Sequence, residues 1–166
     1  MSYHIYTTKG IVLSSWPKGE ADRVYRILTR DLGLVRASAL GVRKESSKLR
    51  GSMEPYSLSK ISLVRGKEYW RATSAEFIQR VPRTAVVARP LALLEQLIQG
   101  EVSHPELFDA VEQNILNQGE EEEMFEIRLV SQILFHLGYM NKSDLSLDKK
   151  SLIRAINSGL ELSHLT

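Results

Sequence analysis

The stretch that decides the fold is TKGIVLSSWPKGEADRVYRILTRDLGLVRASAL, residues 8–40. Three short runs in it are rich in Val, Ile, Tyr and Thr: residues 8–16, 23–29 and 33–40. The turn-forming segments Pro17–Gly19 and Asp31–Gly33 separate these runs. Short runs of β-branched and aromatic residues between turn residues are typical of β-strands. The stretch therefore predicts three consecutive strands.

Two later segments, 57–65 and 68–77, have the same character, with Gly66 between them. Five strands within about 75 residues suit a small closed barrel better than an open sheet, whose edges would need cover. The polar, basic segment 42–53 (VRKESSKLRGSM) is too long for a hairpin turn. We expect it to be a loop with at most one helical turn, and without apolar residues anchored in a core.

The second half of the chain has helical periodicity. We predict four helices from their apolar faces, around Leu91–Ile98 after Pro90, around Leu107–Ile115, from Glu120 to Gly138, and from Asp148 to Leu160. The change from strands to helices falls at Pro82. The sequence thus predicts an α+β protein with a five-stranded β-barrel domain at 1–82 and an all-α helical bundle domain at 83–166.

Composition narrows the class of protein. The 166 residues are 43% hydrophobic and 25% charged, as in ordinary globular proteins. The chain has no cysteine, which excludes a disulfide scaffold, a Cys-based zinc site and a cysteine nucleophile. No apolar run approaches the roughly 18 residues that span a bilayer. The segment MSYHIYTTKG lacks the apolar core of a signal peptide. We expect a soluble, cytoplasmic protein without membrane contact.

Charge is distributed unequally. Residues 1–80 carry a net charge of +8 and residues 81–166 a net charge of −6. Such asymmetry predicts two domains with different partners, and a polyanion is the partner that suits the basic half.

Residues for catalysis are scarce. The sequence has neither a Walker-type loop nor a G-x-G-x-x-G motif, and its four histidines have no metal-binding spacing. Glu20 and Asp22 form an acidic pair in one short loop, for which turn chemistry is the favoured interpretation. We therefore expect no enzyme, no metal and no cofactor. An enzyme that uses Glu20 and Asp22 on a bound metal stays open as a third hypothesis.

The basic residues of the first half are concentrated and interleaved with Tyr25, Tyr56, Tyr69 and Trp70. Cations that follow phosphates and aromatic rings that stack on bases are typical of proteins that bind single strands. The alternative is a barrel with a merely basic surface and aromatic residues in its core. The predicted DNA-binding residues are Arg23, Arg26, Arg36, Arg43, Lys44, Lys48, Arg50, Arg65, Lys67 and Arg71.

Several motifs resemble the RecO family of recombination mediators. In the first half they are Thr8–Leu13, Gly19–Arg23, Leu28–Thr29 with Gly33, Gly41–Lys44 with Ser47 and Leu49, and Glu54–Tyr56. In the second half they are Pro105–Phe108, Phe125–Leu129 and Leu137–Tyr139. The resemblance spans roughly residues 8–140, in the family's order and spacing.

This resemblance implies an oligonucleotide/oligosaccharide-binding (OB) barrel followed by a helical bundle, with a non-enzymatic role in bacterial DNA repair. RecO proteins bind single- and double-stranded DNA and anneal complementary strands. With RecR they load recombinase onto DNA coated by single-strand-binding protein, in the cytoplasm at the nucleoid. Many members carry a four-cysteine zinc module after the segment that here is Leu137–Met140. This chain continues with Asn141 and has no cysteine, so we expect a short form without that module.

The family also recognises the acidic, apolar tail of single-strand-binding protein. We predict a peptide cleft in the helical half, lined by Leu94, Leu97, Phe108 and Phe135. The alternative is that these side chains form the bundle core. For the whole chain, the alternative function is a protein–protein adaptor whose barrel binds RNA or no nucleic acid.

Overall fold

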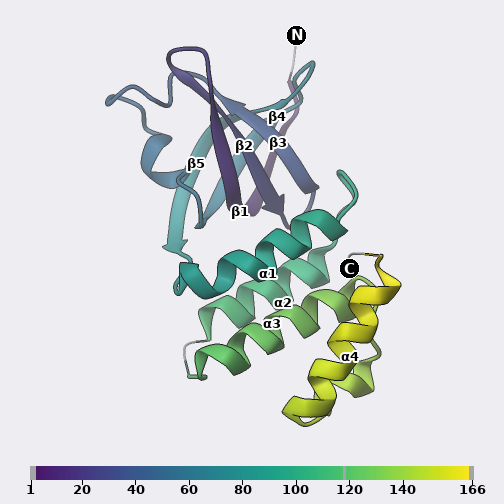
Figure 1. Cartoon of the computed structure of the whole chain (residues 1–166). Helices are drawn as coiled ribbons and strands as arrows, with labels where there is room; N and C mark the ends of the chain where they lie inside the picture. Colours follow the sequence, from purple (N-terminus) through teal and green to yellow (C-terminus); the bar gives the residue numbers. More distant parts are fainter. Residues whose placement is uncertain (1–2, 118, 165–166) are drawn as a thin grey trace. The chain divides into compact units, whose positions relative to one another are not determined.

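Five strands close into a barrel in a computed structural model that describes residues 3–117 and 119–164 (Figure 1). The strands are β1 (Ile5–Lys18), β2 (Asp22–Thr29), β3 (Gly33–Ala39), β4 (Ser57–Val64) and β5 (Trp70–Arg80). Their order around the barrel is β1-β2-β3-β5-β4, and β4 pairs back to β1. All pairs are antiparallel except β3 with β5. The predicted α+β class with an N-terminal OB barrel is confirmed.

The first strand closes the barrel at a glycine. Gly10 of β1 pairs with Thr29 of β2 on one side and with Ser59 of β4 on the other. A Cβ atom on Gly10 would lie 2.7 Å from Cγ2 of Ile27, inside contact distance. The glycine therefore lets β1 pass close over the barrel interior at the point where it changes partners.

The segment between β3 and β4 is anchored in the barrel core. Val42 and Met53 are 1% and 0% exposed, and Leu49 packs against the same core cluster. Between these anchors lies one short 3-10 helix, η1 (Arg50–Ser52). The expected helical turn is present, but the expectation that nothing apolar anchors this loop is wrong. Burial of isolated apolar side chains at its two ends holds a mostly polar segment in place.

The second compact unit consists of helices. They are α1 (Thr84–Leu97), α2 (Pro105–Leu116), α3 (Glu122–His136) and α4 (Lys149–Leu162), with the 3-10 helix η2 (Lys142–Ser146) before α4. Helix α1 begins seven residues before the expected start at Leu91, and Pro90 lies inside it rather than before it. Pro90 is buried, as are Leu91 and Leu94, so packing compensates for the hydrogen bond that a proline removes from a helix.

The segment 98–104 belongs to the barrel unit, which otherwise comprises residues up to 81. The amide of Leu34 donates to the carbonyl oxygen of Gly100 at 3.3 Å. Gly33 has φ +74°, and a Cβ there would lie 2.5 Å from the carbonyl oxygen of Val102.

Because Glu101 lies in this segment, the barrel unit has a net charge of +7 and the helical unit has a net charge of −5.

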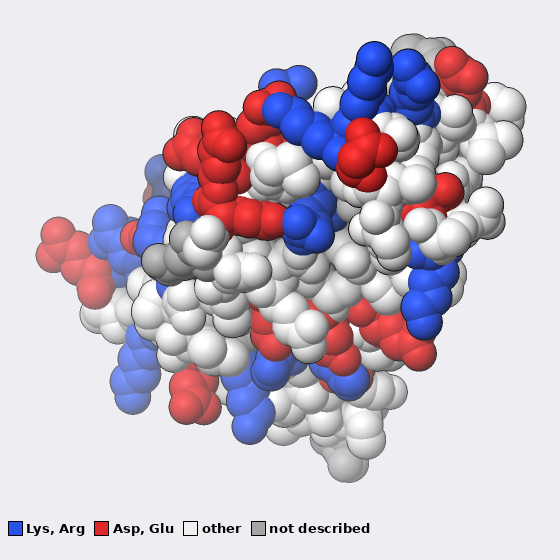
Figure 2. All heavy atoms as spheres, turned by 90° about the horizontal axis from the view of Figure 1, so that it is seen from below, with Lys and Arg blue, Asp and Glu red and all other residues white. Residues whose placement is uncertain are grey.

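In the helical unit, some acidic side chains are paired with cations. Nε and Nη2 of Arg128 donate to the carboxylate of Glu120, and Nζ of Lys149 lies 2.6 Å from Oε2 of Glu123. Acidic and basic side chains are interspersed over the face shown in Figure 2.

Within the described residues, no helix is both long and apolar enough to cross a lipid bilayer.

Candidate nucleic-acid interface

The strand register places some of the predicted cations on the outside of the barrel. On β2, Tyr25 and Ile27 belong to the core cluster, so Arg26 between them points outward. Arg26 lies directly opposite Arg36 of β3, and residues that face each other across two strands share one side of the sheet. Two arginines are thus neighbours on the outer side of β2 and β3.

Aromatic rings flank these two arginines. Cζ of Arg26 lies 5.8 Å from the ring centre of Trp16, and Cζ of Arg36 lies 5.8 Å from that of Tyr69. Nζ of Lys18 lies 4.8 Å from the same Tyr69 ring. Trp16 and Tyr69 are only partly buried, so part of each ring faces solvent. This arrangement alternates cations with aromatic rings.

A hollow of about 340 Å³ beside Tyr69 extends this arrangement, with Lys18, Lys67 and Arg71 among its lining residues and Glu68 as an acidic neighbour. We call the whole region the outer surface. Its cations and rings are Lys18, Arg26, Arg36, Lys67, Arg71, Trp16 and Tyr69.

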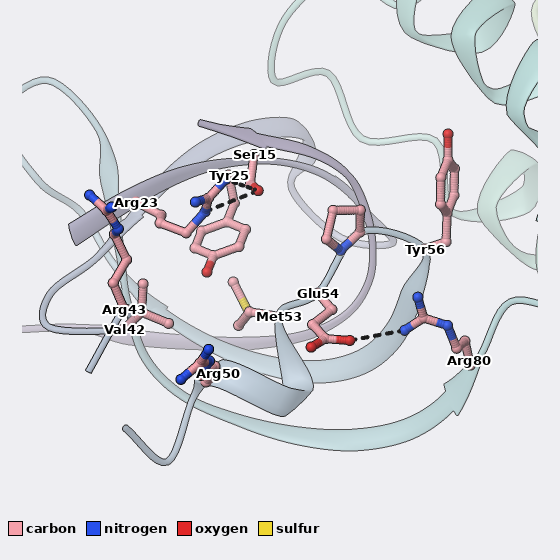
Figure 3. Close-up of a pocket in the computed structure, with 11 residues that line it drawn as sticks. Ser15, Arg23, Tyr25, Val42, Arg43, Arg50, Met53, Glu54, Tyr56 and Arg80 are labelled. Atoms are coloured by element: carbon pink, nitrogen blue, oxygen red, sulfur yellow. Dashed lines mark hydrogen bonds and ion pairs between the residues drawn. The ribbon is translucent and has the colours of Figure 1, made fainter. Parts of the chain in front are cut away.

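A second group of cations lines a hollow of about 640 Å³ at the mouth of the barrel (Figure 3). We call it the barrel-mouth groove. It is lined by Ser15, Arg23, Tyr25, Val42, Arg43, Arg50, Met53, Glu54, Pro55, Tyr56 and Arg80.

Hydrogen bonds hold three of the four arginines that line the groove. Nη2 of Arg23 donates to Oγ of Ser15 at 2.9 Å, and Nη1 of Arg43 donates to the carbonyl oxygen of Gly19 at 2.9 Å. Nη1 of Arg80 lies 3.1 Å from Oε2 of Glu54. Tyr25 is 3% exposed, and burial raises the pKa of its phenol, against the opposing effect of Arg23. The phenol therefore stays a neutral hydroxyl at physiological pH.

The ten predicted DNA-binding residues are thus divided. Arg23, Arg43 and Arg50 lie in the barrel-mouth groove, and Arg26, Arg36, Lys67 and Arg71 lie on the outer surface. Lys44 and Lys48 are exposed on the anchored loop and are not among the residues that line either hollow.

Arg65 is engaged by an acid. Nη1 of Arg65 lies 2.5 Å from Oε2 of Glu101, and Nε1 of Trp70 donates to Oε1 of the same carboxylate at 2.9 Å. Cζ of Arg65 also lies 4.6 Å from the ring centre of Trp70. Trp70 is 6% exposed and belongs to the core, as the alternative interpretation of the aromatic residues expected.

Sequence reasoning missed Lys18, Trp16 and Arg80. Lys18 and Trp16 are at the end of the first strand, and their period-two spacing with Ser14 could have placed them on one face. Arg80 was missed because the fifth strand was expected to end at Phe77, whereas β5 continues to Arg80.

Asp22 has the turn role that was favoured for it. Its Oδ1 accepts a hydrogen bond from the amide of Gly41 at 2.7 Å, which ties the β1–β2 turn to the end of β3. Glu20 is exposed. In residues 3–117 and 119–164, no group of three His, Asp or Glu side chains is placed to hold a metal ion.

In the helical unit, the four residues predicted to contact a peptide differ in burial. Leu94 and Phe108 are 0% exposed and lie in the interior, which agrees with the alternative that these side chains form the bundle core. Leu97 and Phe135 are partly exposed and pack against the cluster that includes Leu134 and Leu152. A peptide at this place would therefore contact Leu97 and Phe135, and the site stays a prediction.

Comparison with known proteins gives an independent result for the barrel. Residues 1–81 match the family model described as "Recombination protein O N terminal". A curated "DNA repair protein RecO" of Synechococcus sp. (strain JA-2-3B'a(2-13)) is 44% identical over 81 residues, which are 49% of this chain and 28% of that protein. The protein of the same name from Gloeobacter violaceus is 39% identical over 82 residues, covering 49% and 31%.

A third relative of that name, from Dehalococcoides mccartyi, is 42% identical over 76 residues, which are 46% of this chain and 30% of the relative. The matched segment thus spans less than a third of each of these relatives. It ends at the barrel, so the resemblance noted for the helical half stays a prediction. Over residues 1–81, by contrast, the chain is similar to the N-terminal part of RecO proteins.

Proposed function

We propose that the outer surface of the barrel binds single-stranded DNA and that the chain serves DNA repair without catalysing a reaction. The observation that carries this proposal is the pair Arg26–Arg36, which face each other across β2 and β3 beside Trp16 and Tyr69. Cations on one face of a sheet can contact successive phosphates of a strand, and the neighbouring rings can stack on its bases.

The position of the outer surface in the barrel supports the same ligand. In OB barrels, oligonucleotides bind to the face of strands 2 and 3 and to the loops between strands 1 and 2 and between strands 4 and 5. Here that face carries Arg26 and Arg36, and the second of these loops carries Lys67 and Tyr69. The relatives' name, "DNA repair protein RecO", is consistent with this ligand.

The finer role we propose is that of a RecO-type mediator in the bacterial cytoplasm, at the nucleoid. Cations on the barrel neutralise phosphates of single- or double-stranded DNA, which lowers repulsion between strands and lets complementary bases pair. RecR and single-strand-binding protein are the proposed partners for loading recombinase. Leu97 and Phe135 of the helical unit are the residues that we propose contact the tail of single-strand-binding protein.

The test is the affinity for a labelled oligothymidylate as a function of salt, measured by fluorescence anisotropy and compared with duplex and RNA of equal length. Each phosphate contact contributes about 0.7 to the slope of log affinity against log salt on single strands. The triple variant Arg36→Gln, Lys67→Gln and Arg71→Gln should therefore flatten the slope by up to about 2. The control Lys142→Gln, Lys150→Gln and Arg154→Gln removes the same charge from exposed sites of the helical unit and should leave the slope unchanged.

Equal slopes for the two triple variants would refute the outer surface as the DNA site. A wild-type chain that binds no oligonucleotide would favour the protein–protein adaptor, and preference for RNA would favour an RNA-binding barrel.

A further inference from the structure

The barrel-mouth groove and the outer surface lie on opposite sides of the same strand. On β2, Arg23 has the same orientation as the core residue Tyr25 and lines the groove, whereas Arg26 points outward. Side chains three residues apart on a regular strand point to opposite faces. The lining residues of the groove and of the hollow beside Tyr69 have no member in common. A ligand on one surface therefore leaves the other accessible.

The groove is organised for an anion before any ligand arrives. Arg23 and Arg43 are oriented by Oγ of Ser15 and the carbonyl oxygen of Gly19, both at 2.9 Å. A guanidinium held by one or two of its five N–H groups keeps the others for phosphate oxygens, which its planar fork matches. In Figure 3, Arg23, Arg43 and Arg50 lie on one side of the hollow, near Tyr25.

The charge of the groove is strongly unbalanced. Its described lining residues include four arginines and one acid, Glu54, which is paired with Arg80 at 3.1 Å. The volume of about 640 Å³ is in the range of hollows that hold nucleotide-sized ligands. Tyr56 at the rim is half-buried, so its ring can contribute a stacking face.

We propose that the barrel-mouth groove binds the phosphates of a second segment of single-stranded DNA while the outer surface holds the first. This inference rests on the proposed function of the outer surface and extends it, because it makes a single barrel bivalent. Two strands on one barrel meet at an effective concentration set by the geometry of the complex, which reaches millimolar values for short tethers. Bivalency thereby accelerates annealing without a catalytic group.

The test uses the full chain and two non-complementary oligonucleotides of about 10 nucleotides, within the site size of one OB barrel. One oligonucleotide carries a donor dye and the other an acceptor, so energy transfer reports joint binding and not base pairing. Sedimentation velocity gives the numbers of protein and DNA chains in the same complex. For the wild-type chain we expect energy transfer and two oligonucleotides per protein chain.

Two matched double variants separate the surfaces. Arg43→Gln with Arg50→Gln removes two exposed groove cations, and Arg36→Gln with Arg71→Gln removes two exposed outer cations. Each should bind one oligonucleotide per chain, lose the energy transfer, and anneal complementary strands several-fold more slowly. Circular dichroism verifies the fold, and the single substitution Arg50→Glu replaces the groove pair if that pair does not fold.

Two outcomes would overturn the inference while leaving the proposed function intact. One is a wild-type chain that binds only one oligonucleotide. The other is a groove variant that still binds two, in which case the groove serves another anion, such as an acidic protein segment. Absence of any oligonucleotide on the wild-type chain would instead refute the proposed function itself.

Discussion

Replacing Glu101 with alanine should destabilise the barrel unit by about 1–3 kcal/mol, because it leaves the indole N–H of Trp70 without its acceptor. Trp70 is 6% exposed, and its Nε1 lies 2.9 Å from Oε1 of Glu101. A buried donor that loses its partner costs its full desolvation penalty, which is the source of the magnitude. The ion pair with Arg65 adds at most about 1 kcal/mol, since its side chains are 64% and 42% exposed.

Glu101→Gln separates these two contributions. The amide oxygen of glutamine can still accept from Trp70, so this variant should lose only the part that depends on charge, less than about 1 kcal/mol. Urea unfolding followed by far-ultraviolet circular dichroism measures both variants, with Glu161→Gln on α4 as a charge-matched control. Equal destabilisation by alanine and glutamine would refute the reasoning, because it would mean that the Trp70 hydrogen bond contributes nothing.

Three further predictions concern the fold and its pH dependence. Gly10→Ala should cost about 1–3 kcal/mol in urea unfolding, because the new Cβ would lie 2.7 Å from Cγ2 of Ile27; unchanged stability would contradict the close approach of β1. Met53→Ala should cost about 2–5 kcal/mol by the same measurement, whereas Lys48→Ala on the same loop should change stability by less than about 0.5; equal effects would mean that the loop is not anchored. Hydrogen bonding to Ser151 lowers the pKa of the Asp148 carboxyl below its ordinary value of 3.8. The ionised carboxylate therefore stabilises α4 fully above pH 3.8, and this stabilisation is lost as the pH falls through the pKa of the folded state. Asp148→Ala should remove this part of the acid dependence of thermal unfolding, and an identical pH profile would contradict the assignment.

The strands of the barrel could be predicted from sequence because pattern and turn chemistry agree there. Residues 23–29 are rich in β-branched and aromatic residues, residues 33–40 alternate in the period of a strand, and both end at turn residues. Strands β2 and β3 match these two runs within one residue. Pro90 shows the opposite case. Local rules place a proline at the start of a helix, yet α1 continues on both sides of Pro90, which is buried like Leu91 and Leu94.

The candidate site was predicted as a set of residues but not as two surfaces. The spacing of Arg23 and Arg26 on one strand already puts them on opposite faces, but only the structure shows a groove on one face and aromatic rings on the other. The pairing of Arg65 with Glu101 joins residues 36 positions apart, through a segment that follows a helix and returns to the barrel. Local patterns carry no information about such long-range contacts.

The most direct test of the outer surface as the DNA site is tryptophan fluorescence, since Trp16 and Trp70 are the two tryptophans of the chain. Trp16 is partly exposed on the outer surface, and Trp70 is buried. Saturating single-stranded DNA should quench the wild-type emission, because bases stack on the exposed indole. Trp16→Phe should abolish the quenching while anisotropy still reports bound DNA. Quenching that persists in Trp16→Phe, or a wild-type complex without quenching, would contradict the account.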